Sequence, residues 1–241
     1  MKRYLSGMLV ALALTSGSAG AATVNLLNDT TTGVVFRGDN LTGSVGNTVT
    51  SNAWVGAFTM QEMLNSSSSQ VLSSFFAFCI DLSNALRRGD YTASPDFPTA
   101  NVNPEWIADA ADRASALFNS VFDMNIVSDA VQAAGFQLAL WNVIYDDDTT
   151  LDGGDFAVTA LGSGSADRAA AIAAGNDFLE SFDPTMANSG PWTLTYFEPT
   201  KPLANQRLVT AAPIPLPAAG WLLLGGLAGL GVLARRKRAA A

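Results

Sequence analysis

Apolar segments at both ends of the chain confine the folded part to the residues between them. Residues 1–21 begin with the basic pair Lys2 and Arg3, continue with a largely apolar run to Leu14, and end in small residues up to Ala21. This order is typical of a secretory signal peptide, and the apolar run is too short to span a bilayer. We therefore expect residues 1–21 to be removed during export by the general secretory route. A buried N-terminal helix is the alternative.

The C-terminal segment, residues 213–238, has a second three-part pattern. Three prolines at alternate positions are followed by an uncharged stretch, residues 218–234, rich in Leu, Gly and Ala, and then by four basic residues at 235–238. The uncharged stretch is at the short end of the range for a transmembrane helix, and the basic cluster is expected to stay in the cytoplasm. The pattern predicts that this helix is held in the inner membrane with the preceding domain outside.

The sequence IPLPAAGWLLLGGLAGLGVLARRKR closely resembles the VPLPA-CTERM class of the PEP-CTERM sorting signals of Gram-negative bacteria, with Ile214 in place of the usual Val. The resemblance implies an exosortase, a membrane transpeptidase with a Cys nucleophile, as a partner during export. It would cut near the prolines and pass the protein to the cell surface. A permanent single-span anchor is the alternative. The sorting motif comprises Pro213, Pro215, Leu216, Pro217, Ala218, Arg235, Arg236, Lys237 and Arg238.

The 241 residues include no His and a single Cys, which excludes several kinds of site. Without His there is no Ser-His-Asp or Cys-His catalysis and no His-ligated zinc. One Cys allows no disulfide within the chain. No Gly-rich phosphate loop of proper spacing is present. We therefore expect the protein not to be an enzyme and to need no cofactor.

Charge is unevenly distributed along the chain. Removing the two ends takes away six of the 13 basic residues and none of the 21 acidic ones, so the formal net charge changes from −8 to −14. An acidic surface argues against nucleic acid and anionic membranes as partners. Solubility outside the cell explains this charge, and bound divalent cations are the alternative.

Residues 22–210 have the length of one domain, and their pattern indicates the α+β class. We expect β-rich N- and C-terminal parts around a central helical portion. The short β-favouring runs are 24–27, 33–37, 48–58, 70–82, 192–197 and 203–210, and helices are expected at 104–122, 129–145 and 166–182. Ser128 is the candidate N-cap of the second helix, Arg87 to Asp90 reads as a polar turn, and 94–104 as a loop.

Cys79 and Gln137 are two residues that a core of apolar side chains does not explain. Cys79 lies in the aromatic run FFAFCIDL, and a lone Cys in an exported protein is unusual. Gln137 lies on the apolar stripe of its helix, where residues three and four positions away are all apolar. An inert buried thiol and a Gln bonded to a neighbouring strand are the simple interpretations.

A single reaction would explain both residues. The Cys sulfur can displace ammonia from the Gln side chain and leave an internal thioester, which needs shielding from water. Phe76, Phe78 and Trp141 are the candidate shield.

The motifs FCIDL and GFQLALW resemble those of the thioester domains of bacterial surface adhesins. The resemblance implies that Cys79 on a strand joins Gln137 on a helix. Ala139, Leu140 and Trp141 match the rest of the helix motif, while Phe136 stands where a Thr is common. The joined acyl group would bond covalently to amines or hydroxyls of a partner.

The densest group of carboxylates follows the second expected helix, at residues 146–155. Oxygen ligands with nearby glycines would suit calcium, and Asp146, Asp148 and Asp152 are the candidates. The EF-hand pattern fails because Thr159 occupies the position of its bidentate Glu. A solvated acidic turn is the simpler interpretation.

Two functions therefore follow from the sequence. The first is a surface-displayed adhesion module with a Cys79–Gln137 thioester that attaches to an unknown surface ligand. The second is a non-covalent structural protein of the exopolysaccharide or biofilm matrix, in which Cys79 is a free buried thiol.

Overall fold

The structure is a computed structural model that describes residues 22–36, 41–43, 53–82, 84–99, 106–158, 165–201 and 205–214. The predicted signal peptide and the sorting segment from Pro215 onward lie outside the described residues. Within the described part, no helix has the length and apolar character needed to cross a membrane.

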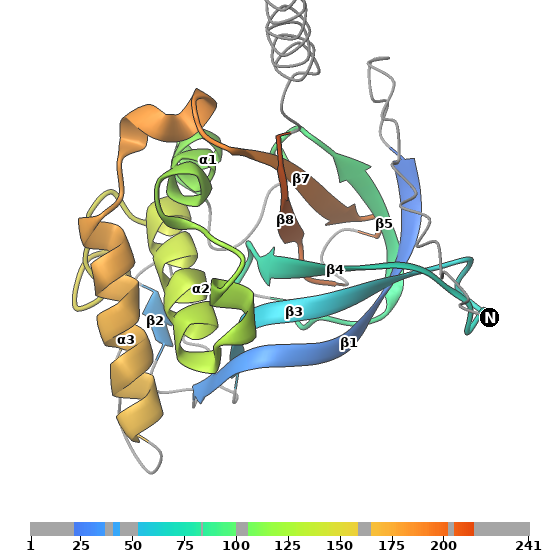
Figure 1. Cartoon of the computed structure of the whole chain (residues 1–241), viewed down its shortest axis with the longest axis horizontal. Helices are drawn as coiled ribbons and strands as arrows, with labels where there is room; N and C mark the ends of the chain where they lie inside the picture. Colours follow the sequence, from blue (N-terminus) through green and yellow to red (C-terminus); the bar gives the residue numbers. More distant parts are fainter. Residues whose placement is uncertain are drawn as a thin grey trace, which may run out of the picture.

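A closed barrel of antiparallel strands forms one side of the molecule, with strand order β1-β3-β4-β8-β7-β5 (Figure 1). Its strands are β1 (Ala22–Phe36), β3 (Ala53–Met63), β4 (Val71–Cys79), β5 (Gly89–Ser94), β7 (Trp192–Pro199) and β8 (Leu208–Pro213). The short strands β2 (Leu41–Gly43) and β6 (Phe156–Val158) pair separately. The helices cover one end of the barrel (Figure 1). They are α1 (Ala110–Val121), α2 (Ala130–Tyr145) and α3 (Ser165–Glu180), with short 3-10 turns η2 (Ile126–Ser128) and η3 (Pro184–Asn188). The expected α+β class is confirmed.

Several local expectations need correction. The runs 24–27 and 33–37 are one strand, β1, because a register shift between Asn28 and Thr30 accommodates the polar stretch while the strand stays paired with β3. The expected turn and loop around residues 87–104 contain strand β5, which pairs with both β1 and β7. Only tertiary pairing stabilises so short and polar a strand.

Two helix starts also differ from expectation. Asp129, rather than Ser128, caps α2, because its Oδ1 accepts hydrogen bonds from the N–H groups of Val131 and Gln132 at 2.9 Å each. The first helix begins at Ala110 instead of residue 104, which lies outside the described residues. At the C-terminal side, β8 continues to Pro213, which pairs with Trp192.

Helix α2 is the centre of the core. Every residue from Ala133 to Tyr145 is buried, and the helix packs against α1, α3, β1 and β3. At Gly135 a Cβ would lie 2.7 Å from the Cβ of Ala174 and 2.9 Å from the backbone nitrogen of Gly175, so α2 and α3 can approach this closely only with glycine there.

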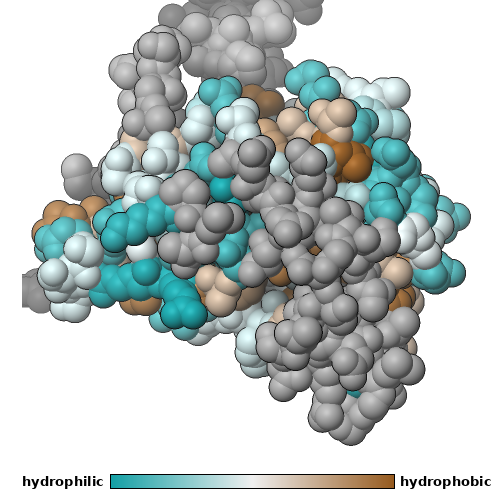
Figure 2. Space-filling model, turned by 180° about the vertical axis from the view of Figure 1, so that it is seen from behind, coloured by the Kyte–Doolittle hydropathy of each residue, from teal (hydrophilic) through white to brown (hydrophobic). Residues whose placement is uncertain are grey.

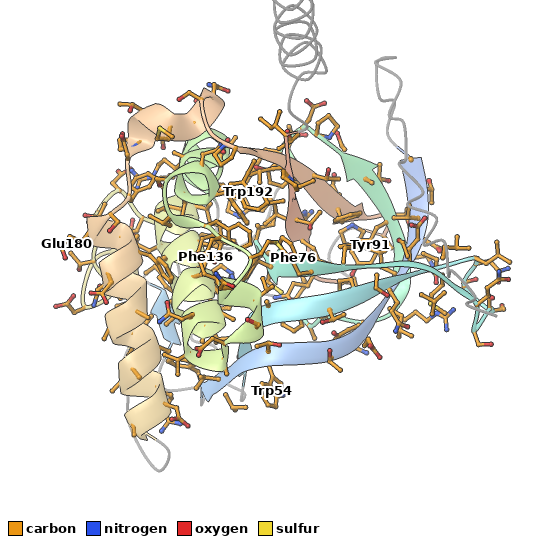
Figure 3. The ribbon with its side chains drawn as sticks, viewed as in Figure 1. Trp54, Phe76, Tyr91, Phe136, Glu180 and Trp192 are labelled. Carbon is orange, nitrogen blue, oxygen red and sulfur yellow. The ribbon has the colours of Figure 1, made fainter. Side chains whose placement is uncertain are left out.

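An aromatic cluster joins β4 to the helices. The Phe78 ring lies 4.9 Å from Phe136 on α2 and 6.0 Å from Phe118 on α1, and Phe122 contacts all three rings. Figure 3 labels Phe136 on α2 and Phe76 on β4. Outside the core, Figure 2 shows hydrophilic residues over much of the described part of one face, interrupted by separate apolar patches. The barrel and helices thus share one core, with the end of β4 inside it.

Candidate functional site

Cys79 is the last residue of β4, at a place where β4 loses one of its neighbours. Pairing of β3 with β4 ends at Phe58 and Ala77, whereas β8 still pairs with Cys79 through Leu208. The next N–H, that of Ile80, donates to the carbonyl of Arg207 on the β8 side at 3.0 Å. Because successive N–H groups of a strand point to opposite sides, the N–H and C=O of Cys79 face the side that β3 has left.

The side chain of Gln137 occupies this vacant side. The Cys79 N–H donates to Oε1 of Gln137 at 2.8 Å, and Nε2 of Gln137 donates to the Cys79 carbonyl at 2.8 Å. Gln137 is 0% exposed and Cys79 1%. The primary amide therefore makes the two hydrogen bonds that a peptide of β3 would make. The two residues singled out in the sequence are brought into direct contact.

Several hydrogen bonds fix Ile80 and Asp81, the two residues after Cys79. The Ile80 carbonyl accepts from Nε1 of Trp106 at 2.9 Å and from the Tyr145 hydroxyl at 3.2 Å. The Asp81 carboxylate accepts from the Arg207 N–H at 2.9 Å, and its carbonyl accepts from Nε2 of Gln206 at 3.0 Å. Cys79 therefore sits on an immobilised segment.

Burial sets the protonation of the groups near the sulfur. Burial raises the pKa of the Cys79 thiol well above its usual value, and the negative charge of Asp81 adds to this. Burial also raises the pKa of Asp81, against the lowering effects of hydrogen bonds from Arg207 and Asn84 and of the Arg207 charge. The Arg207 guanidinium lies 3.6 Å from the Asp81 carboxylate, and both side chains are fully buried. Burial, followed by the charges of Cys79 and Asp81, raises the pKa of Tyr91. At neutral pH the thiol is therefore protonated.

The candidate shielding residues lie on two sides of the pair. Phe78 is fully buried and Phe76 is half-buried, with its ring 5.3 Å from Phe122. Because side chains alternate along a strand, both rings lie on the face of β4 opposite the Cys79 side chain. Trp141 lies one helical turn after Gln137, is 3% exposed, and packs edge-on against Phe156. Its indole N–H has no hydrogen-bond partner among the described residues.

The sequence analysis did not single out Trp106, Tyr145, Asp81 or Arg207. Tyr145 follows Gln137 by eight positions, two turns along the same face of α2, so helical spacing alone could have indicated it. Asp81 lies within the motif FCIDL. Arg207 and Trp106 carry no local signal, because only the pairing of β4 with β8 and the packing of the chain bring them here.

The acidic loop after α2 is built mainly from its own hydrogen bonds. Asp146 is buried, and its carboxylate accepts from the N–H groups of Phe156 at 2.8 Å and Asp148 at 3.1 Å. Asp148 accepts from Thr150 N–H at 3.1 Å, and Asp152 is exposed. Within the described residues no group of three or more acidic or Cys side chains is placed to hold a metal ion. Calcium binding stays a prediction.

The tripeptide at residues 88–90 is also structural. The Arg88 guanidinium donates to the carbonyls of Asn65 at 3.0 Å and Ser68 at 2.7 Å, and Asp90 accepts from the Asn25 amide at 2.8 Å. The Arg88 contacts tie the β3–β4 hairpin to the start of β5, and the Asp90 contact ties β5 to β1.

Solved structures similar to this chain include two surface-protein domains, each with 12% sequence identity to it. The N-terminal thioester domain of a surface protein from Clostridium perfringens covers 80% of this chain and 100% of its own, with a TM-score of 0.38. The N-terminal domain of the Streptococcus pyogenes pilus tip adhesin Cpa covers 77% of this chain and 99% of its own, with a TM-score of 0.39. No protein-family model and no curated protein matches the chain.

Proposed function

We propose that the protein is a surface-displayed adhesion module in which Cys79 and Gln137 form an internal thioester. The observation that carries this proposal is the paired hydrogen bonding of the Gln137 amide to Cys79, in which both residues are fully buried. The contact holds the reacting carbonyl against the residue that bears the nucleophile. Orientation of this kind supplies much of the acceleration of reactions within one molecule.

The reaction balances without an added reagent. Sγ of Cys79 attacks Cδ of Gln137, the bond from Cδ to Nε2 breaks, and ammonia leaves with the thiol proton. The Cys79 N–H already donates to Oε1, so it would stabilise the negative charge that develops on this oxygen. The buried surroundings exclude the water that would hydrolyse the product.

A partner would then be captured by acyl transfer. An amine or hydroxyl of the partner attacks Cδ of Gln137, the bond from Cδ to Sγ breaks, and the Cys79 sulfur takes up the proton. The partner remains attached to α2 through an amide or ester. This single event needs no turnover, in agreement with the expectation that the protein is not an enzyme.

The second candidate function is a non-covalent structural protein of the exopolysaccharide matrix. It is favoured by the same hydrogen bonds, because they give both polar atoms of the buried amide a partner without any chemistry, and by the raised pKa of the Cys79 thiol. In either case we propose export through the signal peptide, transient anchoring in the inner membrane of a Gram-negative bacterium, and transfer to the cell surface by an exosortase.

Intact-mass measurement of the full-length protein separates the two functions. The thioester predicts a mass lower by one ammonia, which is restored in Cys79→Ala and Gln137→Ala, and an adduct with methylamine. Gln132→Ala is the matched control, because Gln132 lies on the same helix but is exposed. It should keep both the deficit and the adduct. A protein of full mass whose thiol titrates only after unfolding would establish the non-covalent function instead.

A further inference from the structure

The acidic loop that joins the end of α2 to β6 brings two carboxylates together at a glycine. A Cβ at Gly154 would lie 2.2 Å from Oδ2 of Asp146 and 2.5 Å from Oδ2 of Asp148. These two oxygens are therefore at most 4.7 Å apart, which is the sum of the two distances. Gly154 also has a φ of 78°, in the region that favours glycine. A side chain at this position would fill the space that both carboxylates face.

The negative charge of this pair is not balanced by a salt bridge. Residues 146–155 contain five Asp and no Lys or Arg, and neither Asp146 nor Asp148 forms an ion pair in the described part of the chain. The Arg113 guanidinium is near, but it donates to backbone carbonyls of α2 and the loop at 2.8 to 3.4 Å. Two like charges this close repel each other, and a cation between them would remove the repulsion.

A fully buried amide beside the pair has an atom without a partner. Nδ2 of Asn142 donates to the Thr150 carbonyl at 2.8 Å and to Oδ1 of Asp148 at 3.3 Å, so the end of this side chain points into the loop. Asn142 is 0% exposed, yet its Oδ1 has no hydrogen-bond partner among the described residues. A buried polar atom without a partner is costly and uncommon in native proteins. This oxygen points to a bound group independently of the carboxylates.

Rotation of the Asn142 amide by 180° would turn this oxygen toward the loop. The two ends of a primary amide have nearly the same shape, so the rotation exchanges the positions of Oδ1 and Nδ2. Oδ1 would then lie about 2.8 Å from the Thr150 carbonyl oxygen and about 3.3 Å from Oδ1 of Asp148. Oxygens this close repel one another unless they share a cation. Calcium holds its oxygen ligands at about 2.3–2.6 Å, which places neighbouring ligands about 3 Å apart and opposite ones about 5 Å apart.

We propose that the side chains of Asn142, Asp146 and Asp148 and the carbonyl of Thr150 bind a calcium ion. We call these four residues the loop site. Asp148 is its central ligand, because one carboxylate oxygen faces Asn142 and the other faces the space beside Gly154 that Asp146 shares. The two carboxylates are too few to hold the ion alone, and the neutral oxygens complete the set. Without calcium, the NH₂ group of Asn142 faces the same oxygens and takes the place of the positive charge.

Calcium at the loop site would join α2 to the strand that follows the loop. The Asp146 carboxylate also accepts from the N–H of Phe156, the first residue of β6, at 2.8 Å. Asn142 lies on α2 five positions after Gln137, so the ion would fix the end of the helix that carries the candidate thioester. The ligands include neither Cys79 nor Gln137, and the loop site therefore does not depend on the proposed function.

Calorimetric titration of the EDTA-treated full-length protein with calcium chloride tests the loop site. We expect a single ion per chain with a Kd of about 10⁻⁴–10⁻³ M, the range of extracellular calcium modules. The Tm should be about 3–10 °C higher in about 10 mM calcium than in EDTA. Magnesium chloride should bind at least about tenfold more weakly, because Mg²⁺ demands shorter, near-octahedral coordination.

Two variants test the ligands. Asp148→Asn removes the charge of the central ligand without changing its shape, so the affinity for calcium should fall by at least about tenfold and the Tm shift should largely disappear. Asn142→Asp has an oxygen at both ends of the side chain, so it needs no rotation and should bind calcium more tightly than the wild type.

The matched control is Asp147→Asn, which changes the net charge equally at the exposed position between the two carboxylate ligands. Its affinity for calcium should equal that of the wild type. No calcium binding by the wild type, an equal loss in Asp147→Asn and Asp148→Asn, or weaker binding by Asn142→Asp would overturn the proposal. Calcium binding by a protein of full mass that forms no amine adduct would leave the loop site standing and remove the thioester.

Discussion

At the scale of single residues, the Gln137 amide takes the place of a missing strand. β3 leaves β4 before Cys79, and the two hydrogen bonds of the amide keep the N–H and C=O of Cys79 satisfied. Each buried polar group left without a partner would cost about 1–3 kcal/mol. Gln137 thus has a structural role even without any chemistry, and the same contact places its Cδ beside the sulfur-bearing residue.

The buried pair of Asp81 and Arg207 leads to a prediction about pH. Arg207→Met leaves the Asp81 carboxylate buried without its cation, so at neutral pH the free energy of unfolding should fall by about 3–5 kcal/mol. The pKa of Asp81 is already raised by burial, and loss of Arg207 removes one of the effects that lower it. A group with a raised pKa in the folded state loses its stabilising effect as pH rises through that pKa. The deficit should therefore shrink as the pH is lowered.

Denaturant unfolding of the Cys79→Ala background at several pH values measures this. The control is Asp81→Asn combined with Arg207→Met, in which residue 81 no longer titrates, so this variant should lack the gain in stability that protonation of Asp81 gives Arg207→Met at low pH. A deficit in Arg207→Met that is constant with pH would show that lost packing, and not the carboxylate, explains it.

At the scale of elements, the contact between α2 and α3 positions Gln137. Helix α2 is buried along nearly its whole length, and Gly135 lies two residues before Gln137 at the close approach to Ala174 and Gly175. Any shift of α2 would move the Gln137 amide away from Cys79. The packing of the two helices is therefore linked to the geometry of the site.

Gly135→Ala should destabilise the protein, although alanine is the better helix former by about 1 kcal/mol. Two of the three atoms nearest the new methyl group belong to the backbone of α3 and cannot turn away. We expect a net loss of about 1–3 kcal/mol in the free energy of unfolding and a lower yield of the mass deficit. Ala170→Gly, at an exposed position on α3, is the control and should cost about 1 kcal/mol from propensity alone without changing that yield. A stabilised Gly135→Ala protein would contradict the close approach of the helices.

At the scale of the whole molecule, the last strand connects the domain to the predicted sorting segment. β8 pairs with both β4 and β7 and continues to Pro213, and the N–H of Ile214 donates to the Pro191 carbonyl at 2.7 Å. The strand that begins directly after Arg207 therefore leads into the Pro-rich stub. A covalent bond at Gln137 and an attachment at the C-terminus would be joined through β4 and β8.

Replacing the four basic residues at 235–238 with serine should abolish sorting. Without them, neither the positive-inside orientation nor the proposed exosortase signal remains. We expect the variant to leave the cell-surface fraction and to keep its full C-terminal segment, as measured by fractionation and intact mass. Lysine substitutions of the three arginines, Arg235, Arg236 and Arg238, preserve the charge and serve as the control for orientation. Surface display of the serine variant would contradict sorting through this segment.

The sequence by itself determined the elements that local pattern specifies. Helical periodicity indicated α2, with its polar residue Gln137 on an apolar face, and the aromatic run indicated β4 with Cys79. A lone Cys and a Gln on an apolar helix face in the same chain were enough to predict a thioester between Cys79 and Gln137. The α+β class followed from the order of these patterns, because each depends on residues close together in the chain.

Only the tertiary structure decided what surrounds that pair. β5 is short and polar, and it exists because β1 and β7 lie on either side of it. Two other features of the site also depend on residues that are distant in the chain. β3 diverges from β4 before Cys79, and Arg207 comes to lie beside Asp81. Such contacts depend on strand register and helix packing, which are set by the whole core and leave no periodic signal in the local sequence.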